Sequence, residues 1–144
     1  MKRLFYLLIT IICMTCLSCS KSDNSARTVE DFDFDWKFQL GDSTAFASTD
    51  FNDSSWRSLH LPHDWSIEGQ FSKSNPSTPG GGALPGGTGW YRKHFSVPQA
   101  EKDEDGNPLR SVFVEFDGVF MNSTVYVNGK EVGTRPYGYS SFSY

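Results

Sequence analysis

The chain of 144 residues carries 13 Lys and Arg against 17 Asp and Glu, for a formal net charge of −4. No basic patch interrupts this acidic balance, so nucleic acid is excluded as an expected partner, because phosphate binding depends on clustered Lys and Arg. The length suits one domain behind a leader segment.

The first segment has the pattern of a secretory signal. Lys2 and Arg3 precede an apolar run from residue 4 to about residue 17, and small and polar residues follow. A helix that spans a bilayer takes about 20 apolar residues, so this run is too short to be one. We therefore expect the mature protein to be exported.

A cysteine at the end of this segment predicts lipidation. In "CLSCS", Ser18 precedes Cys19, and the stretch resembles the lipobox of bacterial lipoproteins, although Cys16 stands where that motif prefers Leu. We interpret residues 1–19 as a lipoprotein-type signal peptide with lipidation at Cys19, and residues 20–30 as a tether. The resemblance implies an outer-membrane lipoprotein, held to the membrane by its lipid and facing the periplasm or the cell surface. An ordinary secretory signal with incidental cysteines is the alternative.

The rest of the chain, residues 31–144, has the pattern of short strands separated by turns. Trp36, Phe38 and Leu40 alternate with polar residues, which predicts a strand over 36–40. The stretch "NSTVYVNGKEVG" predicts a hairpin, because Asn-Gly between apolar runs favours a type I′ turn. Further strands are expected at 58–61, ended by Pro62, at 89–98, at 110–118 and in the closing "TRPYGYSSFSY".

About six strands without a convincing long helix indicate an all-β fold, either a β-sandwich or a jelly roll. The cysteines all lie in the first 19 residues, so this domain has no disulfide and must depend on its core. Because the last stretch is strand-like and has no closing turn, we expect residues 31–144 to form an incomplete domain, truncated at the C-terminus.

One long loop over 62–89, "PHDWSIEGQFSKSNPSTPGGGALPGGTG", separates two of these strands. Loops of this length inside a domain are usually functional or disordered, and apolar residues in the first half favour an ordered one. The glycines are followed by no Lys-Ser/Thr and by a strand rather than a helix, which argues against a phosphate-binding loop.

The polar residues of "HLPHDWSIEG" suggest three kinds of site, each of which we disfavour. A nucleophilic triad of His63, Asp64 and Ser66 would need geometry that near-adjacent residues in an extended loop do not provide. A zinc site on His60 and His63 lacks an evident third ligand. The third candidate is a catalytic carboxylate pair of a glycosidase, formed by Asp64 and Glu68.

Several stretches together resemble the N-terminal sugar-binding domain of family 2 glycoside hydrolases, closest to bacterial β-galactosidases. They are, in order, "DWKFQLGD", "DFNDSSWRSLHLPHDWSIEG", "GGGALPGGTGWYRKHF", "FDGVFMNSTVYVNGKEVG" and "YGYSSF". The resemblance covers about residues 28–144. "LPHDW" and "PGGTGWYRK" are its most specific parts, whereas the "VYVNGKEVG" hairpin is shared with β-glucuronidases and β-mannosidases.

The resemblance implies a jelly roll of the galactose-binding type, followed in whole enzymes by an immunoglobulin-like domain and a (β/α)8 barrel. The barrel supplies two glutamates that hydrolyse a β-linked sugar substrate by a retaining mechanism. No stretch of this chain resembles those barrel segments, so we expect it to be inactive by itself. No cofactor is expected in this segment, and the resemblance leaves any metal to the barrel.

The same resemblance implies that loops of this domain shape the sugar pocket. Asp64, His63 and Trp65 are the candidate substrate-binding residues, with Trp65 favoured as a loop anchor. Some relatives place an Asn just before the strand equivalent to "GWYRKHF"; here that region holds glycines, and Asn75 is the nearest upstream candidate. The alternative function is a stand-alone, non-catalytic carbohydrate-binding lipoprotein.

Overall fold

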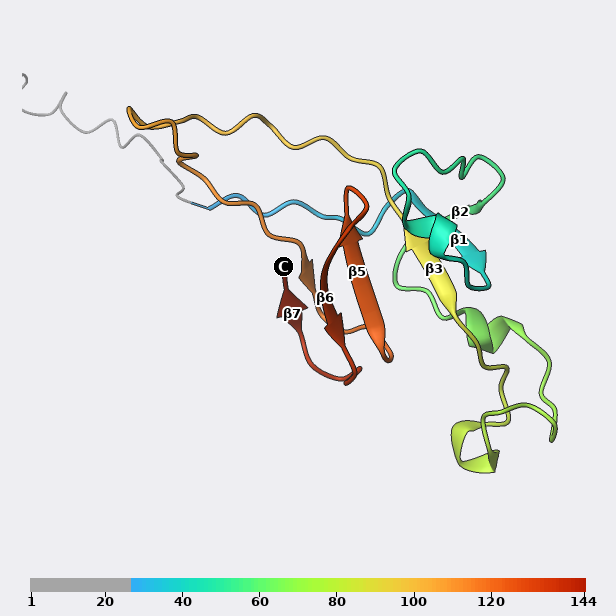
Figure 1. Ribbon diagram of the computed structural model, residues 1–144. Coiled ribbons are helices and arrows are strands. Elements are labelled where there is room, and N and C mark those ends of the chain that lie inside the picture. The colour runs from blue at the N-terminus through green and yellow to red at the C-terminus, as the bar shows by residue number, and fades with distance from the viewer. Residues whose placement is uncertain (1–26) are drawn as a thin grey trace, which may run out of the picture. The chain divides into compact units, whose positions relative to one another are not determined.

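The first sheet is built around the strand that the aromatic alternation predicts. In the computed structural model, which describes residues 27–144, β1 (Trp36–Leu40) lies between β2 (Arg57–Leu59) and β3 (Gly89–Arg92) in an antiparallel sheet (Figure 1). The register pairs Phe38 with Arg57 on one side and with Tyr91 on the other. Because paired residues of antiparallel strands project from the same face, these three side chains meet on one face of the sheet.

Two predicted strand boundaries of this sheet were wrong. The strand expected at 58–61 ends at Leu59, because Asp35 adopts a φ of 60° and interrupts the regular pairing, although the N–H of Leu61 still donates to the carbonyl of Asp33 at 2.8 Å. His60 then uses its side chain, since its Nδ1 accepts the N–H of Asp35 at 3.1 Å. The strand expected at 89–98 ends at Arg92, which pairs with Lys37 one residue after β1 begins.

The predicted hairpin is confirmed. Its strands are β5 (Ser123–Val127) and β6 (Lys130–Arg135), which pair antiparallel with a bulge at Val125 and Tyr126. Asn128 and Gly129 take φ values of 50° and 76°, and positive φ at both central residues defines the type I′ turn.

The third sheet is much shorter than the sequence predicts. β4 (Glu115–Phe116) pairs with β7 (Phe142–Ser143), and one further pair of backbone hydrogen bonds joins Val114 and Tyr144 at 2.9 and 3.1 Å. The strand expected over 110–118 was therefore wrong in length. A strand persists only where a partner takes up its backbone hydrogen bonds, and no paired strand is described beside residues 110–113.

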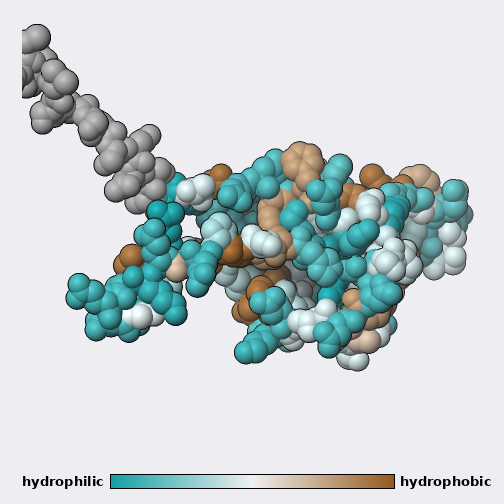
Figure 2. Space-filling view, turned by 90° about the horizontal axis from the view of Figure 1, so that it is seen from above, coloured by the Kyte–Doolittle hydropathy of each residue, from teal (hydrophilic) through white to brown (hydrophobic). Residues whose placement is uncertain are grey.

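Aromatic side chains form what core the described residues have. Phe38, Trp56 and Phe142 are buried, and each is packed against other rings. Around Trp56, the rings of Phe46 and Phe51 meet it with centroids 5.0 and 5.6 Å apart. Many large apolar side chains remain exposed, and Figure 2 shows apolar surface between the polar residues.

The all-β class is confirmed, since residues 27–144 contain strands and no α-helix. Three single-turn 3-10 helices interrupt the loops: η1 (Thr44–Ala47), η2 (Trp65–Glu68) and η3 (Pro79–Gly81). Within the described range no helix has the length and apolarity needed to cross a bilayer. Residues 33–144 form one compact unit. The predicted signal peptide, Cys19 and most of the tether lie outside the described residues.

Candidate functional site

The loop that follows β2 begins with a capped 3-10 turn, not with extended chain. Asp64 is the N-cap of η2, and its Oδ1 accepts the backbone N–H and the hydroxyl of Ser66, both at 2.9 Å. Asp favours this position because its carboxylate satisfies amides that the first turn leaves without partners. The cap fixes the direction in which Trp65 and Glu68 leave the sheet.

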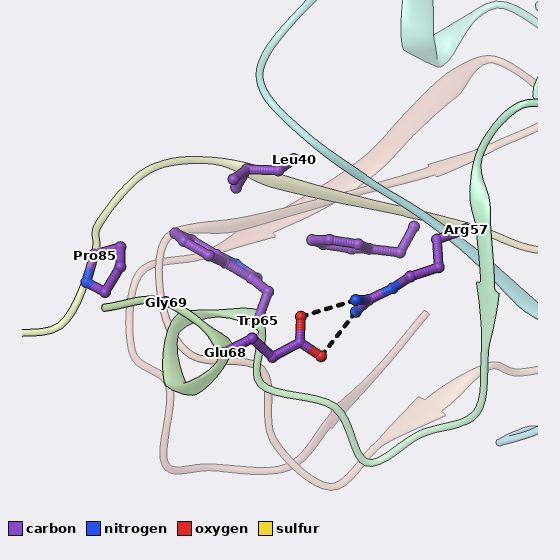
Figure 3. A pocket seen from close by; sticks show the side chains of 7 residues that line it. Leu40, Arg57, Trp65, Glu68, Gly69 and Pro85 are labelled. Atoms are coloured by element: carbon purple, nitrogen blue, oxygen red, sulfur yellow. Dashed lines mark hydrogen bonds and ion pairs between the residues drawn. The ribbon is translucent and has the colours of Figure 1, made fainter. Parts of the chain in front are cut away.

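Glu68 returns to the sheet through a bidentate ion pair. Arg57 Nη1 lies 2.8 Å from Glu68 Oε2, and Nη2 lies 3.0 Å from Oε1 (Figure 3). These hydrogen bonds hold the pKa of Glu68 below its usual value and raise the pKa of Arg57. Both side chains are about half exposed. The pair therefore ties the loop to β2 while one side of it still faces solvent.

His63 lies behind this ion pair and is nearly buried, with 11% of its side chain exposed. Its Nε2 is 2.5 Å from Arg57 Nη2 and its Nδ1 is 2.7 Å from the hydroxyl of Tyr91. A guanidinium can only donate, so we assign the acceptor role to Nε2 and the proton to Nδ1, which donates to Tyr91. Both ring nitrogens of His63 thus have partners inside the chain, and Glu68 Oε1 lies near Nε2 at 3.2 Å.

Phe38 is the apolar floor of this network. Its ring meets those of His63 and Tyr91 with centroids 5.0 and 4.9 Å apart, and the guanidinium of Arg57 lies 5.2 Å from its centroid. Burial is the main cause that raises the pKa of Tyr91 to about 12, and the charge of Asp64 adds to it. Tyr91 is therefore a neutral hydrogen-bonding group at physiological pH, not a base.

Trp65 anchors the loop against glycine backbone. A Cβ added at Gly89 would lie 2.8 Å from Trp65 Nε1, and one added at Gly87 would lie 3.6 Å from Trp65 Cη2. The indole thus occupies space that only glycine leaves open beside β3. The close approach of the indole accounts for the glycine at position 89, where β3 begins.

Asn75 organises the second half of the loop. Its Nδ2 donates to the carbonyls of Gln70 and Ala83 at 2.9 and 2.8 Å, and the N–H of Ser72 donates to Ala83 at 3.1 Å. These bonds close residues 70–83 on themselves. Asn75 is therefore bonded to its own loop rather than to the other three candidates, and its Oδ1 is the atom left to accept from a ligand.

A pocket of about 320 Å³ opens between the sheet and the loop. Figure 3 shows the indole of Trp65 and the Arg57–Glu68 pair facing the same space, with Leu40 on the opposite side. The lining residues are Phe38, Leu40, Arg57, Trp65, Glu68, Gly69 and Pro85. Sequence reasoning missed Arg57 and Leu40 here, because nothing in a strand pattern links them to a loop residue such as Glu68.

The arrangement provides groups that can bind a ligand. Within residues 27–144 no three His, Cys, Asp or Glu side chains are grouped to hold a metal ion. Glu68 is engaged by Arg57, so it is not available as a free acid beside Asp64. What the loop offers is an apolar wall with a few fixed donors and acceptors.

A second polar cluster, formed by Asp53, Arg92 and His94, lies beside the sheet. Asp53 bonds Arg92 Nε at 3.0 Å and His94 Nε2 at 2.7 Å. The guanidinium of Arg92 also donates to the carbonyls of Phe46, Ser48 and Thr49. These bonds join β3 to residues 46–53, so we assign the cluster a structural role.

Comparison with curated proteins identifies long relatives of which this chain matches a small part. A β-galactosidase of Bacteroides ovatus is 56% identical over 128 residues, covering 88% of this chain and 14% of the relative. A putative β-glucuronidase of Formosa agariphila is 41% identical over 136 residues, covering 93% of this chain and 13% of the relative. The chain thus spans about a seventh of the length of these relatives.

Solved structures give the same result. A β-glycosidase from Bacteroides vulgatus superposes with a TM-score of 0.70 at 43% identity, over 79% of this chain and 14% of the other. A glycosyl hydrolase family 2 member from Bacteroides cellulosilyticus superposes with a TM-score of 0.68 at 38% identity, over 79% and 15%. No family model matches the chain.

Proposed function

We propose, from the premise that this chain belongs to the family 2 glycoside hydrolases as their N-terminal domain, that the whole protein hydrolyses terminal β-galactosides or related β-glycosides. The observation that carries the proposal is the 56% identity to a β-galactosidase over 88% of the chain. In a retaining mechanism the catalytic carboxyl groups stand about 5 Å apart across the glycosidic bond. We propose that they belong to a downstream barrel, and that this domain supports that barrel and shapes its pocket.

A β-glucuronide is the second candidate substrate, because a putative β-glucuronidase is 41% identical over 93% of the chain. The two substrates differ in charge, since a glucuronide carries a carboxylate and a galactoside does not. Aryl β-galactoside and aryl β-glucuronide turnover by the protein expressed from its complete gene tests both. Faster hydrolysis of the galactoside supports the first candidate. The absence of both activities would favour a stand-alone carbohydrate-binding lipoprotein.

Within this domain we propose that the loop over 62–89 meets the sugar. Asp64 Oδ1 is used by the helix cap, which leaves Oδ2 to accept from a sugar hydroxyl. Asn75 offers Oδ1 in the same way. His63 acts behind them, because both of its ring nitrogens have partners within the chain.

Asp64→Asn separates the charge of this carboxylate from its structural role. Asn is as good an N-cap as Asp, so η2 should persist, whereas a charged hydrogen bond to the sugar is lost. Such bonds contribute about 1.5–3 kcal/mol, so kcat/KM should fall by about ten- to a hundredfold. Ser54→Ala, in an exposed turn elsewhere, is the control; equal kcat/KM for both variants would remove Asp64 from the site.

We also propose that Cys19 is lipidated and that the mature protein is an exported, outer-membrane lipoprotein. Support comes from the basic start, the short apolar run and the Ser18–Cys19 pair. Labelling of growing cells with an alkyne fatty acid tests this. Incorporation should disappear in Cys19→Ser and persist in Cys16→Ser, and label that persists in Cys19→Ser would refute the assignment.

A further inference from the structure

We propose that the pocket between Leu40, Trp65 and the Arg57–Glu68 pair binds one neutral pyranose unit and disfavours a uronate. The inference rests on the proposed function for its choice of a sugar as the ligand. It adds to that function a particular pocket, a way of holding the ring and a reason for discrimination by charge.

The size and lining of the pocket fit a small amphipathic ring. Its volume of about 320 Å³ lies at the lower end of the range for ligand pockets, about 300–1,000 Å³. Phe38, Leu40, Trp65 and Pro85 supply apolar surface, and Arg57 and Glu68 supply the charged groups. A pyranose has the matching character, because one of its faces presents C–H groups while its edge presents hydroxyls.

The apolar wall is rigid before any ligand arrives. Gly89 brings the β3 backbone against the indole of Trp65, and the ring of Pro85 packs so closely on Gly69 that an added Cβ would lie 2.2 Å from Pro85 Cγ. The cap by Asp64 fixes the start of the turn that carries Trp65. A preorganised wall lowers the cost of ordering side chains around the ligand.

The ion pair still has unused hydrogen-bonding capacity. Arg57 gives two N–H groups to Glu68 and one to His63, which leaves Nε–H and one Nη1–H of its five donors. The carboxylate of Glu68 keeps lone pairs beyond those that Arg57 occupies. Donors and acceptors side by side complement neighbouring hydroxyls, each of which can both donate and accept.

The same pair argues against a uronate. The charge of Arg57 is already matched by Glu68 in a bidentate arrangement, so the pocket offers no unmatched cation for a second carboxylate. A uronate in the pocket would place its carboxylate near that of Glu68, and like charges at close range repel. Neutral sugars avoid this cost. Glu68 is therefore the residue that we expect to set the preference.

The test uses the full-length protein labelled with 5-fluorotryptophan, in which Trp65→Phe identifies the Trp65 fluorine signal. Methyl β-galactopyranoside and methyl β-glucuronide are titrated separately, and the shift of that signal gives each Kd. We expect the galactoside to bind about tenfold or more tightly than the glucuronide. In Glu68→Gln the glucuronide should gain about tenfold, and the discrimination should largely vanish.

Leu40→Gln tests the apolar wall, and Leu109→Gln makes the same change at another exposed leucine. The first should weaken galactoside binding by about fivefold or more, and the second should leave it unchanged. Equal affinity of the unmodified protein for both glycosides would overturn the proposal, as would a Trp65 signal that responds to neither. Both results are measured on the unmodified protein, and Trp65→Phe serves only to assign the fluorine signal.

Turnover measured on the same samples separates this inference from the proposed function. Hydrolysis of an aryl β-galactoside with no response at Trp65 would overturn the pocket assignment and leave the function intact. A Trp65 response with the expected preference, but without hydrolysis of any β-glycoside, would support the pocket and overturn the glycosidase proposal.

Discussion

Gly89→Ala should loosen the candidate site without removing a polar group. The added Cβ would lie 2.8 Å from Trp65 Nε1 and 3.0 Å from both Trp65 Cδ1 and Phe38 Cε2. Ordinary carbon contacts are about 3.5–4.0 Å, so these rings must retreat by about half an ångström or more. Overpacking of this kind costs about 1–3 kcal/mol.

That cost should appear where Trp65 holds the loop. If docking of the loop is weakened by about 1–3 kcal/mol, amide hydrogen exchange over 65–69 should accelerate by about 5- to 150-fold. Exchange in the β5–β6 hairpin should be unaffected. Native-state exchange read by mass spectrometry measures both segments in one experiment.

Gly80→Ala is the matched control, because its nearest atom beyond its chain neighbours is Thr78 Oγ1, 3.8 Å from the added Cβ. It makes the same chemical change in the same loop with room to spare. Equal exchange over 65–69 in the two variants would refute the view that Trp65 anchors the loop through the glycine beside β3.

Three further predictions concern the ion pair, the partly buried tyrosine and the hairpin. Glu68 has a lowered pKa, so its ion pair stabilises the fold above about pH 4.5, and this stability is lost as the pH falls through the lowered pKa. In Glu68→Gln the urea midpoint should therefore fall less steeply with decreasing pH. The same fall in the variant and the unmodified protein would contradict the ion pair. Tyr91 has a raised pKa of about 12, so its neutral form stabilises the folded protein fully below about pH 10, and this contribution is lost between about pH 10 and 12. The absorbance of tyrosinate that the unmodified protein shows and Tyr91→Phe lacks should therefore rise near pH 12. A rise near pH 10 would contradict the burial of Tyr91. Asn128 has a φ of 50°, which costs Ala about 1 kcal/mol and Gly almost nothing. Asn128→Ala should therefore speed amide hydrogen exchange in the β5–β6 hairpin, whereas Asn128→Gly should not. Equal exchange in the two variants would contradict the turn type.

Local pattern was enough to predict part of this structure. The alternation around Phe38 and the Asn128-Gly129 turn depend on neighbours in sequence, and both features form as expected. Strand lengths were predicted wrongly where they depend on the partner strand: the positive φ of Asp35 interrupts the regular pairing of β1 with β2, and the register of β1 with β3 runs only from Gly89 to Arg92. Such boundaries depend on hydrogen bonds between distant segments, which periodicity does not contain.

The candidate site was likewise predicted where its residues are neighbours in sequence and missed where they come from different strands. "LPHDW" drew attention to His63, Asp64 and Trp65 because they lie together in one loop. Arg57 and Tyr91 complete the network from two different strands, and only the register, which pairs both with Phe38, brings them together. The strand sequences "WRSL" and "WYRK" by themselves do not predict that Arg57 and Tyr91 lie side by side with Phe38.

The stereochemistry of hydrolysis tests the central claim most directly. Proton NMR of the full-length protein acting on an aryl β-galactoside should show β-galactose as the first product, with the α-anomer appearing later by mutarotation, because a retaining pair preserves the anomeric configuration. First appearance of the α-anomer, or no release of galactose at all, would contradict the account.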